Sequence, residues 1–448
     1  MKRARFACAL AAALAVTAGP PARAALSPAE HRIVRAVDRH EGAALALWRR
    51  IVDVNSGTLN VAGVRAVADA LEPEWRALGF RTRWVDGAAW NRAGHLVAER
   101  DGRPGAPRVM LVGHLDTVFE PDSPFQRWEA LADGTARGPG IVDMKGGDVV
   151  QLLAVRALRD AGRLDGLSLR VVLSGDEERP GDPLERSRAD LRAAAVGCAA
   201  AIGFEDGDGA LGRAITARRG SSGWRLEVHG TAAHSSQVFR PDIGPGAVFE
   251  AARILAEARD SLAGEPMLSL NPGLILGGTT LALDSSRVGG HASGKSNVVA
   301  DTAVVTGDLR TLTRAQLEHA RAVLVRIAGR HHAATSARFT FDDGYPQLEP
   351  KPGNRRLFEA ASRASRDLGF GALAEVDPMR AGAADVSHIG GIVPLVLDAM
   401  GTKGDGGHTV NEWADLRSLG VQSKRVAVLL SRIADRPAWL DPAHDGER

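Results

Sequence analysis

Apolar and polar positions along the first half of the chain predict helices and buried strands in alternation. Two segments carry apolar residues at helical spacing: residues 143–162, and residues 61–80 with Val64, Val67, Leu71, Trp75 and Leu78. Strands buried on both faces are predicted at residues 106–118, which have a continuous apolar core, and at residues 167–175 and 198–204. A helix between consecutive buried strands predicts an α/β fold, with a mostly parallel sheet and helices on both faces.

The pattern changes in the middle of the chain, where strands and amphipathic helices predict a second domain. Strands are predicted at residues 222–231, 268–279, 295–313 and 336–345, and helices at residues 244–262 and 314–332. This strand–helix–strand–strand–helix–strand order suits a small ferredoxin-like α+β unit inserted into the larger domain. We expect the larger domain to resume near Pro352 with a helix, a strand at residues 392–400 and a last helix.

The N-terminal segment has the pattern of a secretory signal. Lys2, Arg3 and Arg5 precede an apolar stretch and a small-residue site that ends at Ala24. We therefore expect residues 1–24 to be a signal peptide and the protein to be exported, either to the periplasm or out of the cell. Cleavage changes the net charge from +2 to −2, because the segment holds four basic residues and no acidic ones. No basic stripe remains, so neither nucleic acid nor a membrane is an expected partner of the mature chain.

Histidines and carboxylates follow the predicted buried strands, each at the point where a strand ends. Asp176, Glu177 and Glu178 are adjacent after one strand, His114 and Asp116 close another, and Glu205 follows a third; Asp143 precedes a helix and His408 lies in a glycine-rich loop. Each motif alone is also typical of a structural or surface position. Because the carboxyl ends of parallel strands meet at one edge of a sheet, we expect these groups to converge.

Mixed histidine and carboxylate ligation suits zinc or a similar divalent ion. Five candidate ligands exceed the three protein ligands of a single catalytic zinc, and suit two metals about 3.5–4 Å apart that share one carboxylate. The sequence therefore predicts a site for a pair of metal ions that neutralises the acidic cluster.

Five motifs together, HLDTVF, GPGIVDMKGG, GDEE, FED and GHTVNEW, resemble the M20 family of metallopeptidases, in particular its glutamate carboxypeptidase-like branch. The resemblance covers essentially the whole mature chain. It implies two Zn(2+) ions, for which Co or Mn could substitute in vitro: His114 and Glu205 on one ion, Glu178 and His408 on the other, and Asp143 between them. It also implies that Glu177 is the general base, that Asp116 orients His114, and that the peptide bond after Asp143 is cis.

The resemblance also assigns residues of the inserted domain to the substrate. His234, Asn297 and Arg310 would bind the substrate's carboxylate, with His234 reaching the site of the neighbouring subunit in a homodimer. Structural alternatives are open here, because Arg310 could simply pair with Asp308 and Asn297 could be a turn residue. The turn Ala383-Ala384-Asp385 departs from the glycine-rich family pattern, so the preferred side chain of the substrate stays open.

We predict an exported dizinc hydrolase that cleaves the amide bond of a C-terminal amino acid in a small peptide or an N-acyl amino acid. The alternative within the family is an aminoacylase or desuccinylase type of deacylase. A non-catalytic zinc-binding or peptide-binding protein is the alternative from another class, and the presence of Glu177 argues against it. The predicted domains are residues 25–217 and 332–448 for the catalytic domain and residues 218–331 for the inserted lid or dimerisation domain.

A P-loop and a serine nucleophile are both disfavoured. Residues 289–296 match the pattern G-x-x-x-x-G-K-S, but the residues that follow alternate like a strand instead of forming the helix that phosphate binding requires. The chain also lacks the G-x-S-x-G motif of many serine hydrolases.

Overall fold

The computed structural model describes residues 26–284 and 289–440, so the predicted signal peptide lies outside the described residues. The larger domain is built on a six-stranded sheet in the order β1-β2-β6-β3-β7-β16. Its strands are β1 Arg81–Asp86, β2 Gly94–Arg100, β6 Ser168–Ser174, β3 Arg108–His114, β7 Ala200–Gly203 and β16 Val396–Leu397. Strands β6, β3, β7 and β16 pair in parallel, whereas β2 is antiparallel to both β1 and β6. The predicted mostly parallel sheet is confirmed.

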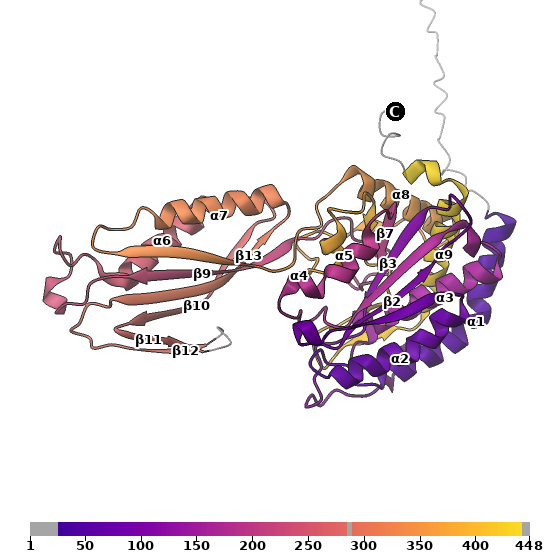
Figure 1. Ribbon diagram of the computed structural model, residues 1–448, viewed down its shortest axis with the longest axis horizontal. Helices are drawn as coiled ribbons and strands as arrows, with labels where there is room; N and C mark the ends of the chain where they lie inside the picture. Colours follow the sequence, from indigo (N-terminus) through magenta and orange to yellow (C-terminus); the bar gives the residue numbers. More distant parts are fainter. Residues whose placement is uncertain (1–25, 285–288, 441–448) are drawn as a thin grey trace, which may run out of the picture.

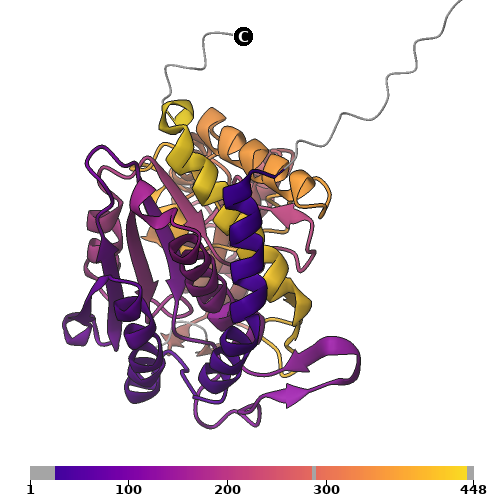
Figure 2. The ribbon, with the colours of Figure 1, turned by 90° about the vertical axis from the view of Figure 1, so that its right-hand side faces the viewer.

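Both faces of this sheet are buried, as the continuous apolar runs predicted. In β3, Val109 and Leu111 join one hydrophobic core, while Met110 and Val112 join the other. Helices that contribute to the first core are α1 Pro28–Val52, α2 Val61–Ala77, α3 Gly146–Asp160, α8 Pro352–Asp367 and α9 Arg417–Asp435. The second core is covered by α5 Ala189–Ala195 and the 3-10 helix η6 Asp385–Ile389. Figure 2 shows the indigo helix α1 and the yellow helix α9 side by side across the sheet.

The inserted domain extends away from the larger domain (Figure 1). Its elements are β9 Gly220–His229, α6 Gly246–Leu262, β10 Ser269–Gly278, β13 Thr302–Thr311, α7 Arg314–Ala328 and β14 Ser336–Asp343. The strands form an antiparallel sheet in the order β10-β13-β9-β14, and α6 and α7 pack on it through a separate hydrophobic core. This arrangement confirms the predicted ferredoxin-like unit.

The predicted boundary of the inserted domain at residue 331 is wrong. Strand β14 pairs with β9 over residues 336–343, so the sheet of the inserted domain continues beyond the second predicted helix. A hairpin of β11 Thr280–Leu283 and β12 Gly290–Ser293 was not predicted. Among the described residues from 289 to 313 the chain forms no helix and runs on into β13, which excludes the P-loop.

Shorter elements complete the larger domain. They are α4 Leu184–Ser187, the parallel pair β8 Arg213–Ala214 with β15 Ala374–Glu375, and a small sheet of β4 Glu129–Ala130, β5 Thr135–Arg137, β17 Lys403–Asp405 and β18 Trp413–Asp415. None of the helices in the described part of the chain has the length and apolar character needed to cross a membrane.

Two adjacent segments connect the domains. Residues 218–221 and 345–348 run antiparallel: Arg218 and Leu348 exchange backbone hydrogen bonds at 3.0 and 3.1 Å, and Ser221 N–H donates to the Tyr345 carbonyl at 2.9 Å. We call these two segments the hinge ribbon. The inserted domain is therefore attached by one hydrogen-bonded pair of strands.

Candidate metal centre

The candidate residues converge at the C-terminal edge of the parallel strands, as the sequence predicted. His114 is the last residue of β3, Glu177 and Glu178 follow β6, and Glu205 follows β7. Asp143 lies in η3 Ile141–Lys145, the turn that leads into α3, and His408 lies in the loop between β17 and β18. Five separate segments thus deliver polar side chains to one place.

The Asp143 carboxylate lies between the two imidazoles. Its Oδ1 is 3.1 Å from His114 Nε2, and its Oδ2 is 3.2 Å from His408 Nε2. Glu205 Oε1 lies 3.7 Å from His114 Nε2, and Glu178 Oε2 lies 3.1 Å from His408 Nε2. Ligand atoms of His114, Asp143 and Glu178 all lie within 4.8 Å of one another. Each imidazole therefore shares Asp143 and has one further carboxylate of its own.

The electrostatics of this cluster fit a bound divalent cation. Burial raises the pKa of Glu205 well above its ordinary range and raises that of Glu178 to about 7, because their negative charge is poorly solvated. Hydrogen bonds to Asp143 and Glu178 raise the pKa of the His408 imidazole to about 11. The carboxylates thus create a strongly negative potential at the two imidazoles. Histidine nitrogens and carboxylate oxygens around such a potential are a donor set for zinc-like ions.

Asp116 supports both halves of the centre from a fully buried position. Its Oδ1 lies 3.5 Å from His114 Nδ1, and its main-chain carbonyl lies 3.0 Å from the same nitrogen. The carboxylate also accepts the backbone N–H groups of Glu177 and Glu178, at 3.0 and 3.2 Å, and the Thr58 hydroxyl at 2.6 Å. Its position suits the predicted role of orienting His114, while its hold on the Glu177-Glu178 turn was not predicted.

Asp176, the first residue of the acidic triplet, does not join the cluster. Its Oδ1 pairs with Arg188 Nη1 at 2.7 Å, and its Oδ2 accepts the Ser187 hydroxyl at 2.7 Å. A buried arginine therefore neutralises this carboxylate, which corrects the expectation that metal ions neutralise all three.

Glu412 lies in the motif GHTVNEW, and the sequence predicted no role for it. It is buried, and its carboxylate accepts the backbone N–H groups of Gly140, Val142 and Asp143 at 3.0, 2.9 and 3.1 Å. These bonds fix the turn that presents Asp143. The Asp143-Met144 peptide bond is cis, as the resemblance implied.

Arg188 and Tyr345 form a second network behind Glu177 that the sequence did not indicate. Arg188 Nε lies 2.7 Å from Asp385 Oδ1, and Asp385 also accepts the Ser174 hydroxyl. The Arg188 Nη2 donates to the Tyr345 hydroxyl at 2.9 Å. Burial raises the pKa of Tyr345 well above its usual value, so this hydroxyl stays protonated. Asp385, in the turn that departs from the family pattern, is thus committed to an ion pair.

The three predicted substrate residues lie at two places on the inserted domain. His234 Nδ1 is 2.8 Å from Ser236 Oγ, and the Asn297 carbonyl accepts the neighbouring Ser235 N–H at 2.9 Å, so these two loops are adjacent. Arg310 Nε donates to Asp308 Oδ2 at 2.7 Å, at the end of β13 nearest the hinge ribbon.

The strand register separates these two places. His229, which leads into the His234 loop, pairs with Thr302, whereas Arg310 pairs with Ser221, eight positions away along β9. At about 3.3 Å per residue, this corresponds to about 26 Å. A single chain therefore does not bring His234 and Arg310 to one small carboxylate.

Comparisons with known proteins identify relatives of this chain. The family model described as peptidase family M20/M25/M40 matches residues 110–432. A carboxypeptidase G2 from Pseudomonas sp. (strain RS-16) is 22% identical over 414 residues, or 91% of this chain and 93% of that protein. A succinyl-diaminopimelate desuccinylase from Gluconacetobacter diazotrophicus is 36% identical over 143 residues, or 31% of this chain and 35% of that protein. A solved Bacillus subtilis structure, described as a dinuclear metal binding peptidase, has a TM-score of 0.62 at 17% identity, covering 89% of this chain and 99% of that one.

Proposed function

Because the chain belongs to the peptidase family M20/M25/M40 and is a metallopeptidase, we propose that it releases a C-terminal amino acid from a small peptide or an N-acyl amino acid. The proposal depends on one observation, namely that the Glu177 carboxylate is left without a hydrogen-bond partner among the described residues. Glu178 contacts His408, whereas no side chain within the described residues hydrogen-bonds the carboxylate of Glu177. A free carboxylate beside a metal-ligand cluster suits a group that moves protons.

The site supports general acid–base chemistry at Glu177. Burial raises the pKa of this carboxyl well above its ordinary range, and the neighbouring Glu178 charge adds to the shift. A metal pair, when bound, supplies Lewis acidity toward a water molecule and an amide carbonyl. The Glu177 carboxylate accepts the proton of the attacking water and then donates it to the amine nitrogen that leaves.

We propose zinc as the native metal. His114 and Glu205 would hold one ion, Glu178 and His408 the other, and Asp143 would be shared, which agrees with the two imidazoles flanking Asp143. Nitrogen and oxygen donors without cysteine suit zinc, and cobalt or manganese could replace it in vitro.

The proposal is tested by assaying amino-acid release from a panel of dipeptides and N-acyl amino acids. We expect Glu177→Gln to keep the metal content of the wild type and to lose more than the roughly 10²–10⁴-fold typical of a general base. Glu185→Gln, at an exposed glutamate beyond the same strand, is the matched control and should retain activity. A metal-loaded wild type that hydrolyses no member of the panel would favour the non-catalytic binding protein instead.

A deacylase of the desuccinylase type is the second candidate. The segment that is 36% identical to the desuccinylase favours it, although that match spans 31% of the chain. N-succinyl and N-acetyl amino acids in the panel separate the two candidates, because a deacylase should prefer them over dipeptides that carry the same C-terminal residue.

We also infer that the protein forms a homodimer through the inserted domain. Support comes from the distance between His234 and Arg310 within one chain. In a dimer, the second subunit could place its own His234 near Arg310 of the first subunit. Phe239 and Phe249 support the same inference, because their side chains are 66% and 60% exposed and their rings are 5.6 Å apart on the inserted domain. Exposed aromatic pairs of this kind are typical of interfaces.

Export is a further proposal, and it rests on the sequence of residues 1–24. N-terminal sequencing of protein recovered from the periplasm or the medium should begin at Ala25 if the signal is cleaved as we propose. Recovery of the uncleaved chain from the cytoplasm alone would contradict export.

A further inference from the structure

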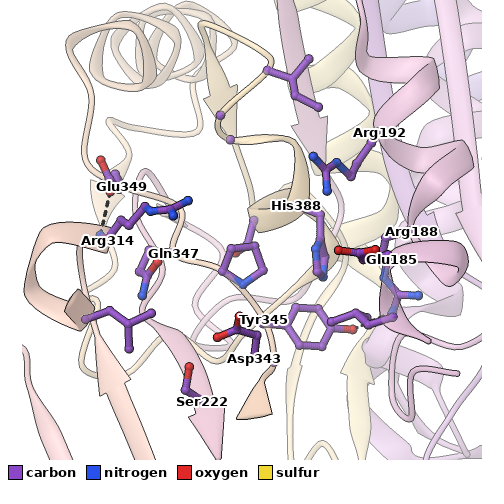
Figure 3. A pocket seen from close by; sticks show the side chains of 18 of the residues that line it. Glu185, Arg188, Arg192, Ser222, Arg314, Asp343, Tyr345, Gln347, Glu349 and His388 are labelled. Atoms are coloured by element: carbon purple, nitrogen blue, oxygen red, sulfur yellow. Dashed lines mark hydrogen bonds between the residues drawn. The ribbon is translucent and has the colours of Figure 1, made fainter. Parts of the chain in front are cut away.

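Tyr345 reaches from the hinge ribbon to the backbone of Glu177. Its hydroxyl donates to the Glu177 carbonyl at 2.7 Å and accepts from Arg188 Nη2 at 2.9 Å. Figure 3 shows the ring of Tyr345 pointing its hydroxyl end toward Arg188. The segment that attaches the inserted domain therefore makes a direct contact with the residue to which we assign proton transfer.

The main chain of Glu177 is held on both sides. Its N–H donates to Asp116 Oδ1 at 3.0 Å, from the larger domain, and its carbonyl accepts from Tyr345, in the hinge ribbon. The Glu177 carboxylate itself has no hydrogen-bond partner within the described residues. These two backbone contacts are thus the polar restraints that determine where the carboxylate lies.

Arg188 stabilises the position of the Tyr345 hydroxyl. Its side chain is 1% exposed and lies 2.7 Å from carboxylate oxygens of both Asp176 and Asp385. An arginine held by two carboxylates has little freedom to move, so the hydroxyl meets a fixed donor. Asp176 directly precedes Glu177, which joins this network to the same turn.

The ring of Tyr345 lies beside a cavity and packs against two neighbouring side chains. A cavity of about 670 Å³ between the two domains is lined by Tyr345, Arg188, Gln347 and His388 among other residues (Figure 3). The His388 ring packs against the Tyr345 ring, with centroids 4.9 Å apart. The Arg188 guanidinium carbon also lies 5.7 Å from the centroid of the Tyr345 ring. Ring packing and the two hydrogen bonds of the hydroxyl together hold the side chain in place.

We propose that Tyr345 is a positioning residue, which holds the backbone of Glu177 in the place from which its carboxylate moves protons. The inference rests on the proposed function of Glu177. Tyr345 touches no reacting atom, and it acts through the main chain of its neighbour. The hinge ribbon thereby sets the position of the general base as well as attaching the inserted domain.

The first test is Tyr345→Phe, which removes only the hydroxyl. We expect kcat to fall by about 10- to 100-fold, as small misplacements of catalytic groups do, with KM within about twofold of the wild type and an unchanged metal content. Gln347→Met is the matched control, because Gln347 lies in the same ribbon as Tyr345 and does not contact Glu177. The Gln347 amide donates instead to Thr311 Oγ1 at 2.7 Å. It should leave kcat unchanged.

The outcomes separate this inference from the proposed function. An active wild type whose kcat survives Tyr345→Phe overturns the positioning role alone, and so does an equal loss of kcat in Gln347→Met, which would indicate a general effect on the hinge. A wild type that hydrolyses no substrate overturns the proposed function and this inference together.

A second measurement avoids any loss of folding in the variant. Tyr345 is the only tyrosine of the chain, so global replacement of tyrosine by fluorotyrosine modifies this position alone. Ring fluorination changes the acidity of the hydroxyl and hence the strength of its hydrogen bond to the Glu177 carbonyl. We expect kcat to change between mono- and difluorotyrosine protein while KM stays constant. Identical kcat values across the series would overturn the inference.

Discussion

The Glu412 carboxylate accepts the backbone N–H of Asp143 at 3.1 Å, across 269 residues of sequence. Glu412 comes from the β17–β18 loop, which also carries His408, and Asp143 comes from the turn before α3. One buried side chain therefore joins the two loops whose imidazole and carboxylate lie 3.2 Å apart. The relative position of the candidate ligands depends on this contact.

Replacing Glu412 by glutamine should weaken metal binding. An amide has one acceptor oxygen where the carboxylate has two, so at least one of three buried N–H groups loses its partner, at a cost of about 1–3 kcal/mol. We expect metal affinity to fall about 10- to 100-fold, measured by competition with a chelator, and Tm to fall as well. Glu129→Gln is the control, since the side chain of Glu129 is 62% exposed on the nearby strand β4. Wild-type affinity in Glu412→Gln would contradict the role of Glu412.

Asp116→Asn should reduce both metal affinity and turnover. The asparagine cannot keep the charge beside His114 and cannot accept both N–H groups of the Glu177-Glu178 turn with equal strength. A loss of about 10- to 100-fold in metal affinity is expected from calorimetric titration. Thr58→Val tests the specificity of the effect, because it removes one donor to the same carboxylate without changing its charge, and the loss there should be smaller. Equal losses in the two variants would show that packing, not charge, is responsible.

His388 should make the protein less stable in mild acid. Burial lowers the pKa of its imidazole to about 4, although the nearby Asp385 partly opposes the shift. The unfolded chain then binds more protons than the folded chain between about pH 4 and pH 6.5, so the contribution is complete above pH 6.5 and is lost as the pH falls to 4. The expected loss is roughly 3 kcal/mol in the free energy of unfolding.

Urea unfolding at a series of pH values measures this effect. In His388→Gln the stability should depend less on pH over the same window, whereas His319→Gln, at a side chain that is 58% exposed, should behave like the wild type. An unchanged pH dependence in His388→Gln would assign the acid sensitivity to other groups.

The proposed dimer should dissociate when the exposed aromatic pair is removed. Phe239→Ser combined with Phe249→Ser takes away two side chains that are 66% and 60% exposed, without disturbing the hydrophobic core of the inserted domain. Light scattering after gel filtration should then report a monomer. Val325→Ser, at a 53% exposed position on α7, is the control and should remain dimeric. A double variant of unchanged mass would place the interface elsewhere.

Arg310→Ala should weaken the binding of substrates that carry a free carboxylate. The Arg310 side chain is 35% exposed, and its pairing with Asp308 orients the guanidinium. A substrate carboxylate would accept hydrogen bonds from this oriented guanidinium. KM should rise about tenfold for free acids and stay constant for the corresponding C-terminal amides. Arg225→Ala, at an arginine of β9 paired with Glu227, should change neither value. An equal effect on free acids and amides would indicate that Arg310 is structural.

The sequence predicted the elements whose burial is periodic or continuous. Four apolar positions of α2 from Val64 to Trp75 are 0% exposed, and Leu78, which caps the helix, is 3% exposed, as helical spacing implied. The predicted bounds of strands were less accurate where a proline interrupts the apolar pattern. The strand predicted at residues 392–400 is reduced to Val396–Leu397, since it follows Pro394, which has no N–H to donate.

The candidate metal-ligand residues were predictable because strand ends converge. The contacts that support them from the hinge ribbon were not predictable. The rule that carboxyl ends share an edge brings His114, the Glu177-Glu178 pair and Glu205 together from the sequence alone, whereas the choice of Glu178 as the ligand came from the family resemblance. Tyr345 and Glu177 are 168 residues apart, and neither spacing nor periodicity marks a single tyrosine in a connection between domains. Contacts of this kind depend on how two domains meet, which no local pattern encodes.

Any rotation of the inserted domain relative to the larger domain would turn about the hinge ribbon. A rotation about two strands bonded to each other displaces each atom in proportion to its distance from that axis. Tyr345 lies in this ribbon, so Glu177, which it contacts, would hardly shift. The loop of His234, beyond the far end of β9, would move furthest. Such a rotation would preserve the contact between Tyr345 and Glu177.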